Sequence, residues 1–278
     1  ILEGLSESEL NDSYMEAKIL KGLNHPNIVK FIEVFKQVTP RSTLNIVMEF
    51  AEGGDLFTRI RGQAKSNGYL PESVVLDWFT QICLAIKYIH KKKILHRDLK
   101  SKNIFLSKNS LIKLGDFGIA KSLSCTMDFT KTRVGTPYYL SPEIVQDKPY
   151  SFKSDIWSLG ILLYEMTMLK MPFEASSLPT LSLKIVRGNY SPIASTVSKE
   201  LKGLIQSLLQ VDIKNRPTIY ELLRHPALKN RIKSFLNDTG NGRRSRRCRC
   251  DRRRHRGSRR ASRPAPSSRR SVKRPWRL

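Results

Sequence analysis

The sequence predicts an α+β fold in which a small strand-containing part comes before a mainly helical body. Two strand-like runs lie near the start, at 28–35 and 44–50, and a polar TPRS connection between them suits a hairpin. The segment 155–166 is apolar nearly all round, which indicates a helix buried inside a helical body. The chain has 278 residues, of which 40% are hydrophobic, so it can bury a substantial core.

The other predicted elements are helices. Residues 13–23 have helical apolar spacing, and the proline of the HPN sequence that follows disfavours continuation of the helix. From Val75 onward the apolar residues again recur at helical spacing, which leaves Asp77, Gln81 and Lys87 on another face. Further helices are expected at 181–187, 199–209 and 219–223.

The net charge of +26 is concentrated at the end of the chain. Residues 241–278 contain 16 Arg and one Lys against a single acid, Asp251. This Arg-, Ser- and Pro-rich composition has few apolar residues, so we expect a disordered tail at 237–278. Its only aromatic residue is Trp276, so it suits contact with an acidic partner or a nucleic-acid backbone without base readout. A nuclear-localisation patch, a solvated end and a shifted reading frame are the alternatives.

The composition excludes some other classes of protein. Cys83, Cys125, Cys248 and Cys250 form no CxxC pair, so we interpret them as reduced thiols. The longest apolar run, 156–169, is too short to span a bilayer, and the first residues lack a secretory signal. We expect a cytoplasmic or nuclear protein without a membrane partner.

Four motifs follow one another along the middle of the chain. They are HRDLKSKN at 96–103, LGDFG at 114–118, GTPYYLSPE at 135–143 and SDIWSLG at 154–160. An aspartate and an asparagine spaced as in the first motif can orient an attacking hydroxyl and hold Mg²⁺ on phosphate oxygens. Ordinary loop carboxylates would not explain the order of all four motifs.

These motifs resemble those of eukaryotic protein kinases from residue 1 to about residue 233. The runs ILHRDLKSKNIFLSKNSLIKLGDFGIAKSL, VGTPYYLSPEI and KPYSFKSDIWSLG resemble the NIMA-related (NEK) Ser/Thr kinases most. The resemblance implies a kinase-like bilobal fold, with a partial β-rich N-lobe (helix C and two strands) at 1–50 and a mainly helical C-lobe at 51–236. It also implies transfer of the γ-phosphate of ATP to Ser or Thr of protein substrates, and a place at the cytoskeleton, such as the centrosome or cilium.

The resemblance assigns the central residues of the transfer reaction. Asp98 is the catalytic base that orients the substrate hydroxyl, and Lys100 steadies the γ-phosphate, which favours Ser/Thr substrates. Asn103 and Asp116 are the Mg²⁺ ligands, as suits a hard cation shared with the phosphates of ATP. Lys100, Asn103 and Asp116 therefore also belong to the ATP site.

The resemblance assigns a second set of residues to the nucleotide pocket, from their positions relative to the kinase pattern. The main chain of Glu49 and Ala51 is expected to bind adenine, and Met48 to guard the back of the pocket. Asp55 is expected to cap the following helix, although contact with the ribose is the alternative. Glu16 corresponds to the ion-pairing glutamate of helix C.

The remaining assignments are regulatory or structural. Thr132 corresponds to an activating phosphorylation position near Thr136, and Arg97 could meet its phosphate. His96 and Phe117 correspond to members of the packed column that links the lobes. Three residues correspond to buried supports, the pair of Glu143 with Arg216 and the loop-holding Asp155.

The start of the chain departs from the kinase pattern. Only Gly4 precedes Glu16, and no lysine precedes Lys18, so the Gly-rich loop and strand lysine of a complete kinase are missing. We therefore expect weak ATP binding and a fragment of an active kinase. The alternative is a non-catalytic interaction protein with a kinase fold, whose basic tail binds an acidic partner.

Overall fold

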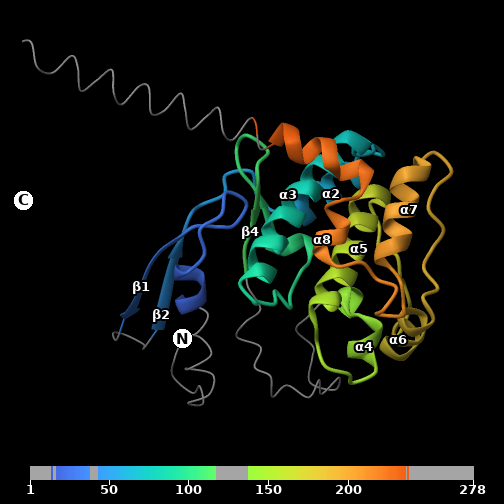
Figure 1. The fold of residues 1–278 in the computed structure, drawn as a ribbon, viewed down its shortest axis with the longest axis horizontal. Helices are drawn as coiled ribbons and strands as arrows, with labels where there is room; N and C mark the ends of the chain where they lie inside the picture. The colour runs from blue at the N-terminus through green and yellow to red at the C-terminus, as the bar shows by residue number, and fades with distance from the viewer. Residues whose placement is uncertain (1–13, 15–16, 38–42, 117–136, 236, 238–278) are drawn as a thin grey trace, which may run out of the picture. The chain divides into compact units, whose positions relative to one another are not determined.

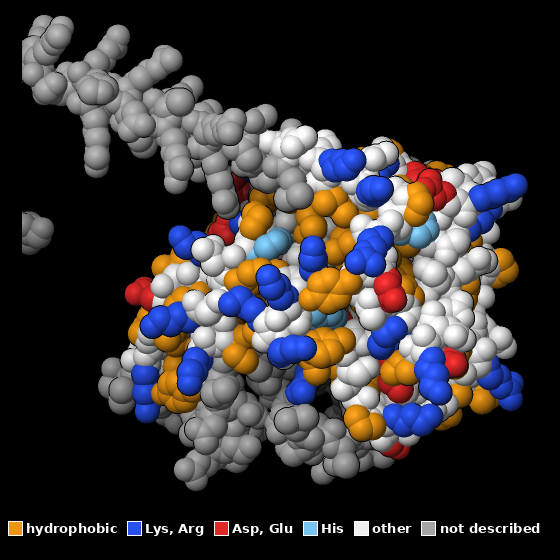
Figure 2. All heavy atoms as spheres, in the orientation of Figure 1, with side chains coloured by type: hydrophobic (Ala, Val, Ile, Leu, Met, Phe, Trp, Pro, Cys, Tyr) orange, Lys and Arg blue, Asp and Glu red, His pale blue; other side chains and the backbone are white. Residues whose placement is uncertain are grey.

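The computed structural model describes residues 14, 17–37, 43–116, 137–235 and 237 (Figure 1). The chain divides into two compact units, Ile1–Ile232 and Lys233–Leu278, and the elements discussed below belong to the first. Lys and Arg side chains outnumber acidic ones on the described part of the face in Figure 2. The elements are β1 (Phe31–Gln37), β2 (Thr43–Met48), α2 (Leu56–Lys65), α3 (Glu72–Lys91), η1 (Ser101–Asn103), β3 (Ile104–Leu106), β4 (Ile112–Leu114), η3 (Pro137–Tyr139), α4 (Pro142–Val145), α5 (Phe152–Met168), α6 (Leu178–Arg187), α7 (Lys199–Leu208) and α8 (Ile219–Leu222).

The predicted hairpin is present, but its first strand begins later than the sequence pattern indicated. β1 and β2 pair in antiparallel fashion, with Val34 opposite Ile46. Residues 28 and 29, which we expected to open the strand, are buried and meet β4 instead: the Val29 N–H donates to the Leu114 carbonyl at 2.9 Å. Residues 28 and 29 of the predicted strand therefore contact β4, and only the residues from Phe31 onward pair with β2.

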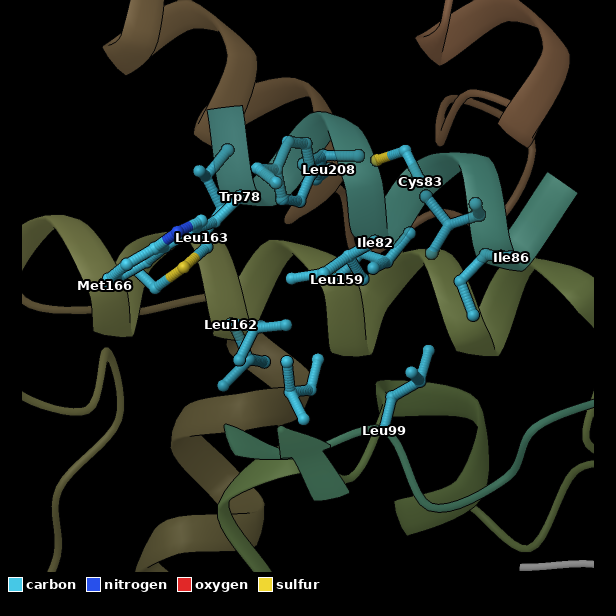
Figure 3. Packing of buried hydrophobic residues seen from close by; sticks show 14 of the residues in the cluster. Trp78, Ile82, Cys83, Ile86, Leu99, Leu159, Leu162, Leu163, Met166 and Leu208 are labelled. Atoms are coloured by element: carbon cyan, nitrogen blue, oxygen red, sulfur yellow. The ribbon is translucent and has the colours of Figure 1, made fainter. Parts of the chain in front are cut away.

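The core of the unit lies between α3 and α5, which run side by side (Figure 1). Figure 3 shows Ile82 and Ile86 of α3 directed toward Leu159 on α5. Every residue from Ser154 to Met166 is buried, so the prediction of a fully buried helix at this point is confirmed. Both helices extend a few residues beyond their predicted bounds.

The prediction for Gln81 was wrong. We placed it on the polar face of α3, but it is only 8% exposed. Its side-chain oxygen accepts hydrogen bonds from Asn27 Nδ2 at 3.0 Å and from the Ile112 backbone N–H at 2.9 Å. A polar residue at this position thus joins the HPN turn to β4, and helical spacing alone does not reveal such a buried polar contact.

The glycine pair before α2 brings that helix against β3. A Cβ atom on Gly53 would lie 2.7 Å from the Leu106 carbonyl oxygen, and Gly54 has a φ of 71°, which favours glycine. Asp55 then caps α2, because its carboxylate accepts from the Thr58 N–H at 2.7 Å. The cap expected from the sequence is confirmed, and α2 is the helix that it was expected to begin, although the sequence analysis gave no bounds for that helix.

Among the described residues, no helix combines the length and the apolar character needed to cross a bilayer.

Candidate active site

The loop at 96–103 connects the end of α3 to β3. Leu99 is 1% exposed and His96 is fully buried, so these two residues anchor the loop in the core. Arg97 has a φ of 68°, an uncommon conformation for a residue with a Cβ atom. These constraints leave the intervening Asp98 with a side chain that is 25% exposed.

Asp155, at the start of α5, holds the backbone of this loop. One carboxylate oxygen accepts from the His96 N–H at 3.1 Å and the other from the Arg97 N–H at 3.2 Å. The same group also lies 2.7 Å from His90 Nε2 and accepts from the Tyr150 hydroxyl at 2.5 Å. Burial disfavours the charged form, but these hydrogen bonds and the two histidines outweigh it, and the pKa of Asp155 lies below its ordinary value. The loop is thus fixed by an ionised, fully bonded carboxylate.

Two polar side chains of the loop, those of Lys100 and Asn103, converge on Asp98. Lys100 Nζ lies 2.6 Å from Asp98 Oδ2. Asn103 Nδ2 donates to the Asp98 carbonyl at 2.9 Å and to Asp98 Oδ2 at 3.0 Å. Since the amide nitrogen makes these contacts, the amide oxygen is the atom of Asn103 suited to a cation.

Asp116 lies beside this cluster, two residues after β4. The Gly115 N–H donates to the Asn103 carbonyl at 3.0 Å, and Asn103 Nδ2 is 3.5 Å from the Asp116 carbonyl. Burial and the charge of Asp98 raise the pKa of Asp116, while Lys100 lowers it. The carboxylates of Asp98 and Asp116 thus interact electrostatically, and Asn103 belongs to the same cluster. Carboxylate and amide oxygens are donors that Mg²⁺ uses together with water and phosphate.

No group of three or more His, Cys, Asp or Glu side chains suited to a metal ion occurs within the described ranges. The neighbourhood of Asn103 and Asp116 is compatible with this result, because Mg²⁺ sites of this kind take only one or two carboxylates from the protein. Substrate phosphates and water supply the remaining ligands.

The stretch after β2 is joined to β3 and β4, because the Gly53 N–H donates to the Leu106 carbonyl and Glu49 pairs with Lys113. The Glu49 N–H donates to the Lys30 carbonyl at 2.8 Å, and the Glu49 carboxylate lies 2.8 Å from Lys113 Nζ. The Ala51 carbonyl accepts from the Gly54 N–H at 3.4 Å. Met48 is partly buried and packs against the core. The Glu49 carbonyl and the Ala51 N–H are thus the groups of these two residues suited to a ligand.

Glu143 and Arg216 form a buried ion pair with two parallel hydrogen bonds, of 3.0 and 3.2 Å. Ser154 also donates to Glu143 at 2.6 Å, and the Arg216 guanidinium lies 5.1 Å from the centre of the Trp157 ring. Burial opposes ionisation of Glu143, yet the hydrogen bonds and the charge of Arg216 hold its pKa below the ordinary value. The pair ties the start of α4 to the segment before α8.

A further buried network was not predicted from the sequence. Ser101 Oγ donates to Glu165 Oε1 at 3.0 Å, and the Tyr139 hydroxyl donates to the other oxygen of the same carboxylate. The Ser101 N–H donates to the Tyr139 hydroxyl at 3.2 Å. Glu165 within an otherwise apolar helix was the available signal, because such a buried acid requires partners.

Four residues assigned from the sequence lie outside the described residues. They are Glu16, Phe117, Thr132 and Thr136.

Comparison with known proteins identifies the family. The protein kinase domain model matches residues 2–228. The chain is 45% identical to Serine/threonine-protein kinase Nek1 of Mus musculus over 233 residues, covering 84% of this chain and 19% of the relative. It is 48% identical to Serine/threonine-protein kinase Nek5 of Homo sapiens over 236 residues, covering 84% of this chain and 32% of the relative.

A shorter relative is covered more fully. The chain is 40% identical to Serine/threonine-protein kinase nekl-2 of Caenorhabditis elegans over 243 residues, covering 85% of this chain and 67% of the relative. The chain spans less than half the length of the mammalian Nek1, Nek5 and Nek3 relatives that it matches. The matched region includes both motif loops and the ion pair of Glu143 with Arg216. The chain therefore belongs to the protein kinase family and, within it, to the NEK Ser/Thr kinases.

Proposed function

We propose that this chain carries the transfer centre of an enzyme that moves the γ-phosphate of ATP to a Ser or Thr hydroxyl of a protein substrate. Membership of the protein kinase family implies the use of ATP. The observation that carries the proposal is the convergence of Lys100 and Asn103 on the carboxylate of Asp98. An ordinary surface aspartate is not usually held by two neighbouring polar side chains in this way.

In the proposed reaction, the substrate hydroxyl is hydrogen-bonded to Asp98. Its oxygen attacks the γ-phosphorus in line with the leaving oxygen of ADP, whose bond to phosphorus breaks, and the hydroxyl proton passes to Asp98. Lys100 Nζ, 2.6 Å from this carboxylate, is placed to steady the transferred phosphoryl group. Asp155 supports the reaction indirectly by fixing the backbone that carries Asp98.

The residues near the phosphates suit Mg²⁺. Asn103 would contribute its amide oxygen and Asp116 its carboxylate, and the ion would neutralise charge on the phosphate oxygens. The raised pKa of Asp116 reflects burial and the charge of Asp98, and a nearby cation would favour its ionised form. The Glu49 carbonyl and Ala51 N–H would hold adenine, with Met48 behind it.

The other assignments belong to the same proposal. Phosphorylation of Thr132 would activate the enzyme by pairing with Arg97. Glu16 would pair with the strand lysine that a complete kinase carries, and Thr136 belongs to the Gly-Thr-Pro motif that follows Thr132. His96 and Phe117 would form the packed column. We propose the division into 1–50, 51–236 and 237–278 on the same grounds, and a cytoplasmic, nuclear or cytoskeletal location stays a prediction.

The test is transfer of labelled γ-phosphate from ATP to a generic Ser/Thr substrate. It compares residues 1–278 with a version extended at its N-terminus by the corresponding segment of a NEK relative, each with and without Asp98→Asn. We expect the extended version to be more active, and Asp98→Asn to lower its rate by about 10²- to 10⁴-fold. An inactive extended version, or an equally active Asp98→Asn variant with an unchanged unfolding temperature, would overturn the proposal.

A second function is supported by the charge of the sequence. The one Lys and 16 Arg of residues 241–278 favour contact with an acidic protein or nucleic acid, and this does not require phosphoryl transfer.

A further inference from the structure

A cleft of about 190 Å³ lies where the end of α3 meets the beginnings of α5 and α8. None of Asp98, Lys100, Asn103 and Asp116 lines it, so it is separate from the proposed transfer centre. Its floor is apolar, because Ile156 and Ile219 line it and are nearly fully buried.

The rim of the cleft carries aromatic surface. Phe152 is 37% exposed and Tyr220 is 46% exposed, although both are large apolar side chains. The Phe152 ring is held by an edge-to-face contact with His90, with 4.8 Å between ring centres. A partly exposed aromatic pair over an apolar floor is suited to receive another apolar side chain.

The rim is also basic. Lys91, Lys93 and Lys153 line the cleft, and none of the acidic residues that the structure describes does. Lys153 Nζ donates to the Arg216 carbonyl, so this ammonium group is held in position. Basic side chains stand among apolar ones over the face that carries α3, α5 and α8 (Figure 2).

One nearby acid acts on Lys153 of this rim. The Glu221 carboxylate accepts from the Thr218 N–H at 2.7 Å and from its hydroxyl at 2.9 Å, which caps α8, and its charge interacts with that of Lys153. Asp155 is fully buried beneath the cleft and bonded to His90 and the loop backbone. Lys91 and Lys93, both exposed, therefore present their charge to solvent.

The size of the cleft indicates what it can hold. Its volume is below the roughly 300 to 1,000 Å³ of pockets that enclose a drug-sized ligand, so it suits a single large side chain. We propose that this cleft is a docking site for an acidic segment of a protein partner, which inserts one aromatic side chain between Phe152 and Tyr220 and sets its carboxylates against Lys91 and Lys93. A polyanion without an apolar side chain would meet the lysines but leave the floor unfilled.

The experiment uses two fluorescein-labelled peptides of equal charge, EEDFEED and EEDAEED, and measures their binding to the full 278-residue chain by fluorescence anisotropy. The two peptides carry the same charge, so charge attraction to the Arg-rich tail does not distinguish them, and the ratio of their dissociation constants reports the contribution of the aromatic side chain. We expect the Phe peptide to bind at least about fivefold more tightly, as for the loss of a well-buried interface anchor.

The variants locate this preference. Tyr220→Ala should bring the ratio close to one, and the pair Lys91→Glu with Lys93→Glu should lower affinity for the Phe peptide by at least about fivefold. The matched control is Lys65→Glu with Lys108→Glu, which makes the same charge change at exposed positions that do not line the cleft. The control should keep the ratio of the two dissociation constants and should lower the affinity for the Phe peptide less than the pair Lys91→Glu with Lys93→Glu does. Phe152→Ala replaces Tyr220→Ala if thermal unfolding shows that the latter is not folded.

Three results would overturn the proposal. The first is a ratio near one in the unchanged chain. The second is a ratio that neither aromatic variant reduces, or an affinity for the Phe peptide that the lysine pair does not lower. The third is binding of a labelled oligothymidylate that depends on Lys91 and Lys93 while the peptides show no preference, which would assign the surface to nucleic acid. None of these results depends on phosphoryl transfer.

Discussion

At the scale of single residues, two buried charged side chains, Asp155 and Arg216, hold chain segments in place, and they do so with different kinds of partner. Asp155 is satisfied mainly by hydrogen-bond donors, including backbone N–H groups of the loop. Arg216 is satisfied by a carboxylate, Glu143, and by the Lys153 carbonyl at 2.6 Å. A buried charge is stable only while these partners remain, so each of them is sensitive to substitution.

Arg216→Ala should lower the free energy of unfolding by about 3 to 5 kcal/mol, because it leaves Glu143 buried without its cation. Urea denaturation of the variant and the unchanged chain measures this difference. The double variant Glu143→Gln with Arg216→Ala should lose less than the two single losses added together. Additive losses would show that the pair is not coupled.

The pH dependence of the same variant should change sign. In the unchanged chain the pKa of Glu143 lies below its ordinary value of 4.5, so its contribution to stability is present above that pH and is lost as the pH falls through the lower folded value. Without Arg216, burial raises the pKa, and acidification from about pH 7 to about pH 5 should stabilise the variant relative to the unchanged chain. Parallel stability curves over this range would contradict the expectation.

At the scale of elements, α5 is the helix against which other parts of the body pack. Its contact with α7 depends on Gly160, where a Cβ atom would lie 2.8 Å from Leu208 Cβ and 2.8 Å from Leu209 Cδ2. Glycine has a low helical propensity, but at this position its missing side chain allows α5 and α7 to approach closely.

Gly160→Ala should reduce the free energy of unfolding by about 1 to 3 kcal/mol, since the added methyl group overpacks the interface of α5 and α7. The matched control is Gly203→Ala on α7, where a Cβ atom has no neighbour within 4 Å. The control should gain about 0.5 to 1 kcal/mol from helical propensity. Equal changes in the two variants, measured by urea denaturation, would show that the close approach does not matter.

The success of the sequence predictions also depended on the element. The helices found at 72–91 and 152–168 were both predicted, the first from apolar spacing over many turns and the second because residues 155–166 are apolar nearly all round. The three-residue strands β3 and β4 are too short to show a period, and they exist through pairing with each other, with Phe105 opposite Lys113. Asp98, Lys100 and Asn103 could be grouped from one short motif, whereas contacts such as Ser101 with Glu165 join distant segments and leave no local pattern.

At the scale of the whole chain, the charge is divided unevenly. Residues 241–278 carry 16 Arg and one Lys against one acid, while the rest of the chain mixes its excess of basic residues with 23 of the 24 acids. Contact with polyanions should therefore depend chiefly on the tail, even though the described surface also presents lysines.

Removal of residues 237–278 should weaken binding to single-stranded oligothymidylate by at least about tenfold at low salt, because fewer counterions are released. It should also flatten the slope of log affinity against log salt concentration. Fluorescence anisotropy at several salt concentrations measures both quantities. Unchanged affinity and slope after the deletion would remove the tail from the binding proposal.

The attachment of the loop at 96–103 to Asp155 has a consequence for amide hydrogen exchange. The N–H groups of His96 and Arg97 donate to a carboxylate that is itself fully buried. Their hydrogens can exchange with solvent deuterium only when α5 separates from the loop, which is close to unfolding of the whole core. These two loop amides should thus exchange as slowly as those in the middle of α5, and a loop that carries chemistry would share the lifetime of the most protected helix.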